Sequence, residues 1–535
     1  MWDVVGLCMG ALVAIMISHW LYRWQNPKCK GKLPPGSMGL PLIGETLHFF
    51  YPTTTYDIPP FIKTRMTRYG SLFRTSIVGQ KVIVSTDHEF NYQIFQQEGK
   101  SFKIWYLETF NKIVGENQSL LAYQGTFHKY LKNLILHLLS PQNLKERLIL
   151  EMGQCTRSHI LTWVNHGGIV DVKEGASNMV FEFIVKKLLS YEEMKEGKKL
   201  KENFNSFMDG LISFPLNIPG TAFHTCIQGR NNVIKAIKDI INERKASKTI
   251  KGDYLDHLLE EMEKDDKFLN EAIAVDMIFL ILFASFETAS STITLAIKMI
   301  SDHPQVLAQL TKEYETIIKS RGCDFHENSE ITWEEYKAMT FTHMVINEVV
   351  RLANIVPGIF RKVVNDVQIK GYTIPANWLV MVVPSVAHLS DNIYKDPLKF
   401  NPWRWQGKEL HTGSKTFMAF GGGARLCVGA DFAKLEMAIF IFQLVSRYRW
   451  TIIKGGEIVR KPGLMFPNGL HIKISEKHNK ERCHGVGEVR SKGRLRGRLF
   501  AAMVFDSSRR MGCGGLVVRH GGCMMATMEH LRNTQ

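Results

Sequence analysis

The decisive stretch of this 535-residue chain is FGGGARLCVG, residues 420–429, which places one cysteine, Cys427, among glycines. A helical pattern from about Ala430 to Tyr448 follows it directly. Glycines allow the backbone to pass close beneath a flat ligand, and backbone N–H groups near a sulfur stabilise its thiolate. The positive end of the following helix favours the thiolate further. The stretch therefore favours a Cys427 thiolate beside a flat ligand, with Arg425 placed to bind an anionic group of that ligand, and a buried free cysteine is the alternative.

The fixed residues of this stretch are Phe420, Gly423, Arg425, Cys427 and Gly429, in the spacing F-x-x-G-x-R-x-C-x-G. With this spacing the segment resembles the haem-binding loop of the cytochromes P450. The resemblance implies that haem b is the cofactor, that these five residues bind it, and that Cys427 is the axial ligand to the iron. It also implies the cytochrome P450 fold, mainly α with a smaller β region, in which haem lies between a long distal helix and the Cys-ligand loop.

Two further segments carry the resemblance. Glu348 and Arg351 form an E-x-x-R pair, a spacing that puts both charges on one face of a helix. Alone, such a pair would indicate only a surface ion pair. Here it precedes FNPWRW, residues 400–405, which resembles the later arginine-containing segment of the family. The resemblance implies that Glu348, Arg351 and Arg404 form a structural clamp behind the haem, and that none of them is catalytic.

A strongly apolar run from Ala272 to Ile300 predicts a long helix, and the charged residues inside it favour a buried core helix over a second membrane span. It contains Ala284-Ser285-Phe286-Glu287-Thr288, where the family usually has A/G-G-x-D/E-T. The resemblance implies that Glu287 and Thr288 are catalytic and deliver protons on the oxygen-binding face of the haem. Ser285 replaces the usual glycine. Its side chain is expected to narrow the oxygen groove or to hydrogen-bond the preceding turn, with consequences for coupling.

The carboxylates of the haem are expected to be bound by basic residues outside the Cys427 loop. The usual W-x-x-x-R of the family reads here as HKYLK, so His128 and Lys132 take the two positions that bind propionates. Arg361, four residues after Pro357, resembles an additional propionate-binding arginine of the family.

The two ends of the chain differ from its middle. Residues 4–21 are almost wholly apolar and would span roughly 27 Å as a helix, close to the thickness of a thin membrane. Basic residues follow this run, so we expect residues 1–24 to anchor the chain in the endoplasmic reticulum membrane, with the catalytic body in the cytosol. A cleaved signal peptide is the alternative, but no basic segment precedes the run. Residues 25–46 are basic and rich in Pro and Gly, and predict a hinge before a catalytic domain at 47–475.

The composition fits a globular catalytic protein, with 45% hydrophobic and 22% charged residues. Nine cysteines without a C-x-x-C pair argue against a disulfide framework or a structural zinc site. The net charge is +16, and residues 476–535 hold twelve Lys or Arg and five Asp or Glu. We expect this tail to be disordered or an artefact of the gene sequence, the alternative being an RNA- or membrane-binding segment. Nucleic acid is not expected as a partner, while an acidic protein and membrane lipid are.

Within the cytochromes P450, the sequence looks like the plant clan that oxidises brassinosteroids, sterols and triterpenoids, and most like its triterpenoid and sterol hydroxylases. That implies hydroxylation of a large apolar polycyclic substrate, with O₂ and with electrons from NADPH through NADPH-cytochrome P450 reductase. The alternatives are brassinosteroid-type hormone or sterol side-chain oxidation, an O₂-independent rearrangement, and a haem-binding protein without turnover. The expected substrate-pocket residues are Trp105, Phe110, Phe283, Ala284, Ile355, Val356 and Phe466. The loop at residues 213–220 is apolar and broken by proline, and we expect it to dip into the membrane and border a substrate entrance, with an ordinary buried loop as the alternative.

Overall fold

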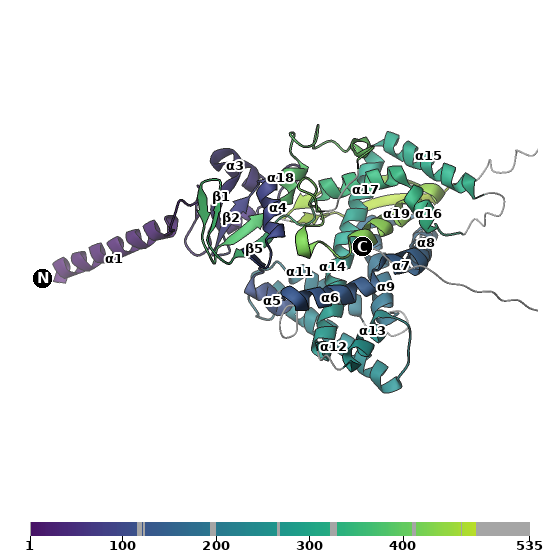
Figure 1. Cartoon of the computed structure of the whole chain (residues 1–535), viewed down its shortest axis with the longest axis horizontal. Coiled ribbons are helices and arrows are strands. Elements are labelled where there is room, and N and C mark those ends of the chain that lie inside the picture. The colour runs from purple at the N-terminus through teal and green to yellow at the C-terminus, as the bar shows by residue number, and fades with distance from the viewer. Residues whose placement is uncertain are drawn as a thin grey trace, which may run out of the picture. The chain divides into compact units, whose positions relative to one another are not determined.

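The computed structural model of the chain describes residues 2–114, 120, 123–192, 199–264, 268–321, 329–408, 413–461 and 463–477. In this part, helices dominate and the strands form small sheets (Figure 1). The predicted mainly α fold with a smaller β region is therefore confirmed. All but the first two residues of the predicted tail, residues 478–535, lie outside the described ranges.

The N-terminal helix α1 (Trp2–Gln25) begins the chain (Figure 1). Its segment Val5–Gln25 is long and apolar enough to cross a membrane, and none of that segment is buried in the protein. In the described chain one other helix passes the same test of length and composition, α14 (Glu271–Asp302), of which half the tested window is buried. The predicted anchor, residues 1–24, thus lies almost wholly within α1.

Much of the predicted hinge is attached to the folded body. The Gly36 backbone forms a bridge with Arg74, and the Gly44 backbone forms one with Ile77. Gly36 has φ of +147°, and a Cβ atom there would collide with the Arg74 carbonyl. Glycine is needed at this position because the two backbones approach closely. The second half of the 25–46 segment therefore extends the sheet edge and is not a free linker.

The largest sheet has five strands in the order β1–β2–β8–β5–β3, in which β2 and β8 are parallel and the other neighbours antiparallel. A cluster of buried apolar side chains covers it, including Ile83, Phe102 and Val380. Two short helices, α2 and α3, precede the first strand of this sheet in the chain. These elements are α2 (Thr46–Phe49), α3 (Pro60–Tyr69), β1 (Leu72–Ile77), β2 (Gln80–Ser85), β3 (Phe102–Ile104), β5 (Ile359–Val363) and β8 (Leu379–Val382).

The helical part surrounds α14, which packs against α9, α12, α17 and α19 (Figure 1). Its apolar residues point to all sides, which buries most of the helix in the main core. The helices with their bounds are α4 (His88–Gln96), α5 (Glu108–Ile113), α6 (Gly125–Leu138), α7 (Pro141–Asn143), η2 (Leu144–Leu148), α8 (Ile149–Asn165), α9 (Val172–Leu189), α11 (Leu200–Gly210), α12 (Ala222–Ser247), α13 (Tyr254–Glu263), α15 (Pro304–Ser320), α16 (Trp333–Ala338), α17 (Thr340–Ala353), α18 (Pro384–His388), η3 (Pro402–Trp405), η4 (Gly423–Arg425) and α19 (Ala430–Arg447).

The remaining described strands form three smaller sheets. One has the order β4–β12–β9, and the other two are the pairs β10–β11 and β6–β7. Their bounds are β4 (Ile169–Asp171), β6 (Val367–Ile369), β7 (Tyr372–Ile374), β9 (Tyr448–Gly455), β10 (Val459–Arg460), β11 (Leu464–Met465) and β12 (Leu470–Glu476). β12 therefore closes the described fold.

Candidate functional site

The Cys427 loop is a tight turn that leads into α19. The Cys427 backbone N–H donates a hydrogen bond to the Phe420 carbonyl over 3.0 Å. Gly421 and Gly423 have φ of +76° and +64°, the left-handed region, and a Cβ on Gly423 would collide with the Phe95 carbonyl. The loop therefore needs glycine both for its turn and for its contact with α4.

The Cys427 side chain is exposed, although the helix that follows is mostly buried. Burial by the surrounding protein nevertheless raises the pKa of the Cys427 thiol. A hydrogen bond from the Gly429 backbone and the positive charge of Lys132 both act to lower it. The sulfur is thus accessible, and the Gly429 backbone and the Lys132 charge beside it favour a thiolate.

The distal helix α14 opens at one face only near its middle. Ala284 and Thr288, one turn apart, are exposed, whereas Leu282, Phe286 and Ala289 beside them are buried. The Thr288 hydroxyl donates to the Ala284 carbonyl over 2.8 Å and lies 3.1 Å from the Ser285 carbonyl. This face therefore borders an open space and presents a hydroxyl to it.

Two outcomes were expected for the Ser285 side chain, narrowing of the oxygen groove or a hydrogen bond to the preceding turn, and the second is observed. Its hydroxyl donates to the Leu282 carbonyl over 3.2 Å, which is a bond to the preceding turn of the helix.

Glu287, the predicted partner of Thr288, is engaged elsewhere. Its Oε2 accepts a hydrogen bond from the Lys173 ammonium of α9 over 2.8 Å, and Ser291 donates to its Oε1 over 3.3 Å. The Lys173 ammonium also donates to the Ser290 hydroxyl over 3.1 Å. No hydrogen bond joins the Glu287 and Thr288 side chains, both of which the structure describes. Glu287 is thus held by an ion pair to α9, a contact that the sequence did not reveal.

The predicted carboxylate-binding residues come together around one acidic residue. The Glu98 carboxylate accepts from Arg361 Nε over 2.9 Å and from Arg425 Nε over 2.8 Å. His128 Nε2 is buried and has no hydrogen-bond partner. Burial and the nearby Arg425 charge lower the pKa of His128. The Lys132 ammonium donates to the Ala424 carbonyl over 3.2 Å.

These residues fit the haem that the Cys427 loop implies. The buried Nε2 of His128 has no hydrogen-bond partner and lies near the charges of Arg425 and Lys132, so an anionic group would satisfy it. Haem carries two carboxylates, and its iron takes a thiolate on one side, which the exposed Cys427 sulfur offers. The residues that would hold it are Cys427, Arg425, Arg361, His128 and Lys132.

Glu348, Arg351 and Arg404 form one network, in which Glu348 and Arg351 are fully buried and Arg404 is partly buried. Arg351 donates to both Glu348 oxygens, over 2.9 and 2.7 Å, and Arg404 Nε donates to Oε1 over 2.9 Å. The Trp405 indole and the Asn401 backbone N–H also donate to this carboxylate, each over 3.0 Å. Both oxygens of the Glu348 carboxylate therefore accept a full set of hydrogen bonds, and these bonds join α17 to η3.

His388 connects this network to the chain that leads to Cys427. Its backbone carbonyl accepts from Arg351 Nη1 over 2.7 Å. Its Nδ1 lies 2.7 Å from the Asn354 side-chain oxygen, and its Nε2 accepts from the Met418 backbone N–H over 3.0 Å. Burial lowers the pKa of His388 to about 3, so the ring is neutral at physiological pH. In the neutral ring with its proton on Nδ1, that nitrogen donates and Nε2 accepts, which matches both contacts.

The predicted substrate-pocket residues lie in part together. The ring of Phe110 is 6.1 Å from that of Phe283, and Phe283 is 6.0 Å from Phe207 of α11. Trp105 instead contacts Phe360, with ring centroids 5.8 Å apart. Of the others, Ile355 is half-buried, Val356 and Ala284 are exposed, and Phe466 is buried. Phe207 had not been predicted from the sequence.

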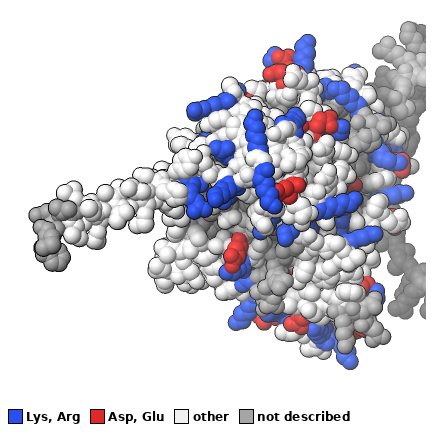
Figure 2. Space-filling view, turned by 60° about the vertical axis from the view of Figure 1, so that its left-hand side comes forward, with Lys and Arg blue, Asp and Glu red and all other residues white. Residues whose placement is uncertain are grey.

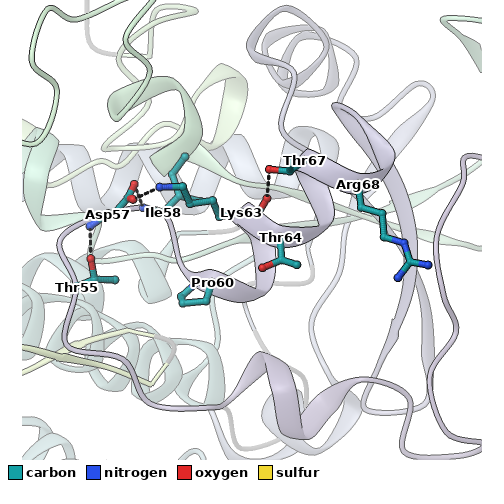
Figure 3. Close-up of a pocket in the computed structure, with 8 residues that line it drawn as sticks. All are labelled: Thr55, Asp57, Ile58, Pro60, Lys63, Thr64, Thr67 and Arg68. Atoms are coloured by element: carbon teal, nitrogen blue, oxygen red, sulfur yellow. Dashed lines mark hydrogen bonds and ion pairs between the residues drawn. The ribbon is translucent and has the colours of Figure 1, made fainter.

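A separate hollow of about 670 Å³ is lined by residues of α3 and the segment before it (Figure 3). It contains none of the predicted site residues. The Lys63 ammonium pairs with the Asp57 carboxylate, and the Thr67 hydroxyl donates to the Lys63 carbonyl (Figure 3). The Asp57 carboxylate is thus paired with a neighbouring cation, and none of the residues that line the hollow belongs to the predicted site.

Sequence reasoning missed Glu98, Lys173 and His388. Each contacts a predicted residue that is distant in the chain. For Glu98 the available signal was that a buried arginine requires an anion, whereas no sequence pattern pointed to Lys173 or His388.

The comparisons with known proteins agree with this site. The chain matches the family model described as Cytochrome P450 over residues 34–475. It is 50% identical over 475 residues to Cytochrome P450 87A3 of Oryza sativa subsp. japonica. The aligned region covers 88% of this chain and 91% of the rice protein. It is 40% identical over 480 residues to Beta-amyrin 16-alpha-hydroxylase CYP87D16 of Maesa lanceolata, covering 89% of this chain and 100% of that one.

Among solved structures, the retinoic acid-bound cyanobacterial CYP120A1 superimposes with a TM-score of 0.74 at 26% identity, over 84% of this chain and 100% of that chain. The residues that match the family model, 34–475, include the Cys427 loop, α14 and the Glu348 network. The chain therefore belongs to the cytochrome P450 family and is a monooxygenase related to plant members of that family.

Proposed function

We propose that this chain hydroxylates a triterpenoid or sterol, with O₂ and with electrons passed from NADPH by NADPH-cytochrome P450 reductase, at the endoplasmic reticulum membrane. The observation that carries the substrate class is the apolar distal face. Ala284 and Phe283 of α14, together with Phe110 of α5, offer carbon surfaces and rigid rings to a ligand. The Maesa lanceolata relative, which acts on beta-amyrin according to its name, supports the same class.

The residues of the chain have separate roles in this proposal. Thiolate-ligated haem supplies the activation of oxygen. Cys427 would hold the iron, while Arg361, Arg425, His128 and Lys132 would bind the haem carboxylates. The Thr288 hydroxyl holds a proton on the exposed face of α14, and it would supply that proton once it turns away from the Ala284 carbonyl. Glu287 passes protons when its carboxylate leaves Lys173.

The reductase is proposed to dock on the side of the Cys427 loop. Lys132 donates to the Ala424 carbonyl of that loop, and the Lys434 ammonium lies 5.6 Å from the centre of the Phe420 ring. Cations at this loop suit an acidic electron-donating partner. On the face drawn in Figure 2, Lys and Arg are interspersed with Asp and Glu, so charge alone does not mark a single docking patch.

Two kinds of apolar surface support membrane binding. The surface of α1 in Figure 2 is almost free of charge. The loop between α11 and α12 exposes apolar side chains, with Phe214 82% and Ile218 52% exposed. Such large exposed apolar groups favour a lipid interface. We propose that this loop dips into the membrane beside the anchor.

Charged substitutions test this contact. In the chain without residues 1–24, Phe214→Asp with Leu216→Asp is expected to lower co-sedimentation with lipid vesicles several-fold, because burying a charge in lipid is costly. The matched control is Ile250→Asp, since Ile250 is 81% exposed outside this loop. Vesicle binding that survives the loop substitutions would exclude the contact.

Substrate-binding spectra test the substrate class. The haem absorbance of the full-length protein is titrated with beta-amyrin, cholesterol and a linear fatty acid of similar hydrophobicity. Rigid polycyclic ligands are expected to shift the haem spectrum at lower concentration than the fatty acid, because the aromatic walls fit a flat, stiff body. Preference for the flexible fatty acid would contradict the proposed class.

Thr288→Ala is expected to keep haem bound but to lower the product formed per NADPH about 10²-fold, since a proton donor contributes that much to catalysis. NADPH consumption should continue. Thr292→Ala is the control, because Thr292 makes the same kind of bond one turn later, to the Thr288 carbonyl over 2.7 Å, and is buried. Equal product yields from the two variants would remove Thr288 from the proton path.

A further inference from the structure

Glu98 joins two arginines that are far apart in the chain. It lies between α4 and β3, and its side chain is only 7% exposed. One carboxylate oxygen accepts from Arg361 of β5 over 2.9 Å, and the other accepts from Arg425 of η4 over 2.8 Å. A single buried acid therefore connects the large sheet to the Cys427 loop.

The contacts of Glu98 set the orientation of both guanidinium groups. Arg361 is also held by a bond from Nη1 to the Phe360 carbonyl over 2.9 Å, and its charge lies 5.6 Å from the centre of the Phe95 ring. Arg425 Nη2 donates to the Tyr123 carbonyl. Because a guanidinium is planar, two bonds on different edges fix the plane in which its remaining donors point.

Glu98 also sets the charge of this region. Arg361, Arg425 and Lys132 are three cations, and the neutral state is favoured for His128 because burial lowers its pKa. The one carboxylate offsets one of these cations. Two positive charges then remain for the two carboxylates of haem.

We propose that Glu98 is a positioning residue for the cofactor, which holds Arg361 and Arg425 in the orientation that binds the haem carboxylates and limits the positive charge beside them. Excess positive charge near haem favours the ferrous state, so Glu98 keeps the reduction potential of the iron low. The proposal rests on haem binding by this chain, which the haem absorbance of the wild-type protein tests separately.

The experiment measures the midpoint potential of full-length protein with haem bound. Glu98→Gln keeps the size of the side chain and removes its charge. It is expected to shift the ferric–ferrous equilibrium about tenfold toward ferrous iron, which is about 59 mV in the positive direction for one electron. The matched control is Glu89→Gln, which removes an exposed carboxylate of α4 that pairs with Lys415, and leaves the potential unchanged.

A second variant separates the effect of the Glu98 charge from the effect of its side-chain length. Glu98→Asp keeps the charge but is too short to bond both arginines, so the potential stays near the wild-type value while haem is lost to apomyoglobin several-fold faster. An unchanged potential in haem-loaded Glu98→Gln, or wild-type haem loss in Glu98→Asp, would overturn the proposal. So would loss of the helical circular dichroism signal in both variants, because Glu98 would then support the fold alone.

Discussion

Replacing Cys427 with alanine is expected to abolish product formation and to remove the thiolate-type carbon monoxide spectrum, while the domain stays folded. The side chain is exposed, so its loss leaves no cavity in a packed core. The bond that shapes the loop, from the Cys427 N–H to the Phe420 carbonyl, belongs to the backbone and survives the substitution. Only the ligand to the iron is therefore lost.

The matched control for this substitution is Cys29→Ala, which removes a half-buried thiol outside the site. It should keep both the spectrum and the activity. A Cys427→Ala protein with normal product formation would show that another residue ligates the iron. Circular dichroism of both variants checks that the fold is unchanged.

Replacing Glu348 with glutamine is expected to destabilise the protein by about 3–5 kcal/mol and to prevent haem loading, because it leaves buried cations without their anion. Glu348 is fully buried and takes bonds from Arg351, Arg404, Trp405 and the Asn401 backbone. Glutamine has the same size, so the loss reports charge and hydrogen bonding, and packing is unchanged. Urea unfolding with haem absorbance measures both effects.

Glu334→Gln is the control for the clamp, since Glu334 is an exposed acid that pairs with Lys337 on α16. It should leave unfolding unchanged, because exposed ion pairs contribute little. If Glu348→Gln unfolded at the wild-type urea concentration and kept its haem, the clamp would have no structural role.

Signals that could be predicted from the sequence were local. The Cys427 loop carries its glycines and arginine within ten residues, and α14 shows its apolar character over its whole length. The Glu348–Arg351 pair lies on one helix face, so its mutual contact follows from helix geometry. These elements needed no knowledge of the tertiary fold.

Contacts that could not be predicted join distant parts of the chain. Glu98 sits in a loop without any pattern, and its partners Arg361 and Arg425 are 263 and 327 residues away. Lys173 is 114 residues from Glu287. A charged residue in the sequence has many possible partners, and only the packing of α9 on α14 selects this one. The attachment of residues 36–44 to β1 likewise depends on the sheet being formed.

The most direct test of polycyclic hydroxylation by this chain is the mass of the product formed by membranes that contain it and a plant reductase, supplied with beta-amyrin or cholesterol. We expect a new product heavier by one oxygen atom, formed only with NADPH and absent with Cys427→Ala. A product that forms without NADPH, or that Cys427→Ala still makes, would contradict it. If a protein with a normal thiolate-type carbon monoxide spectrum formed no oxidised polycyclic product, the proposed substrate class would be wrong.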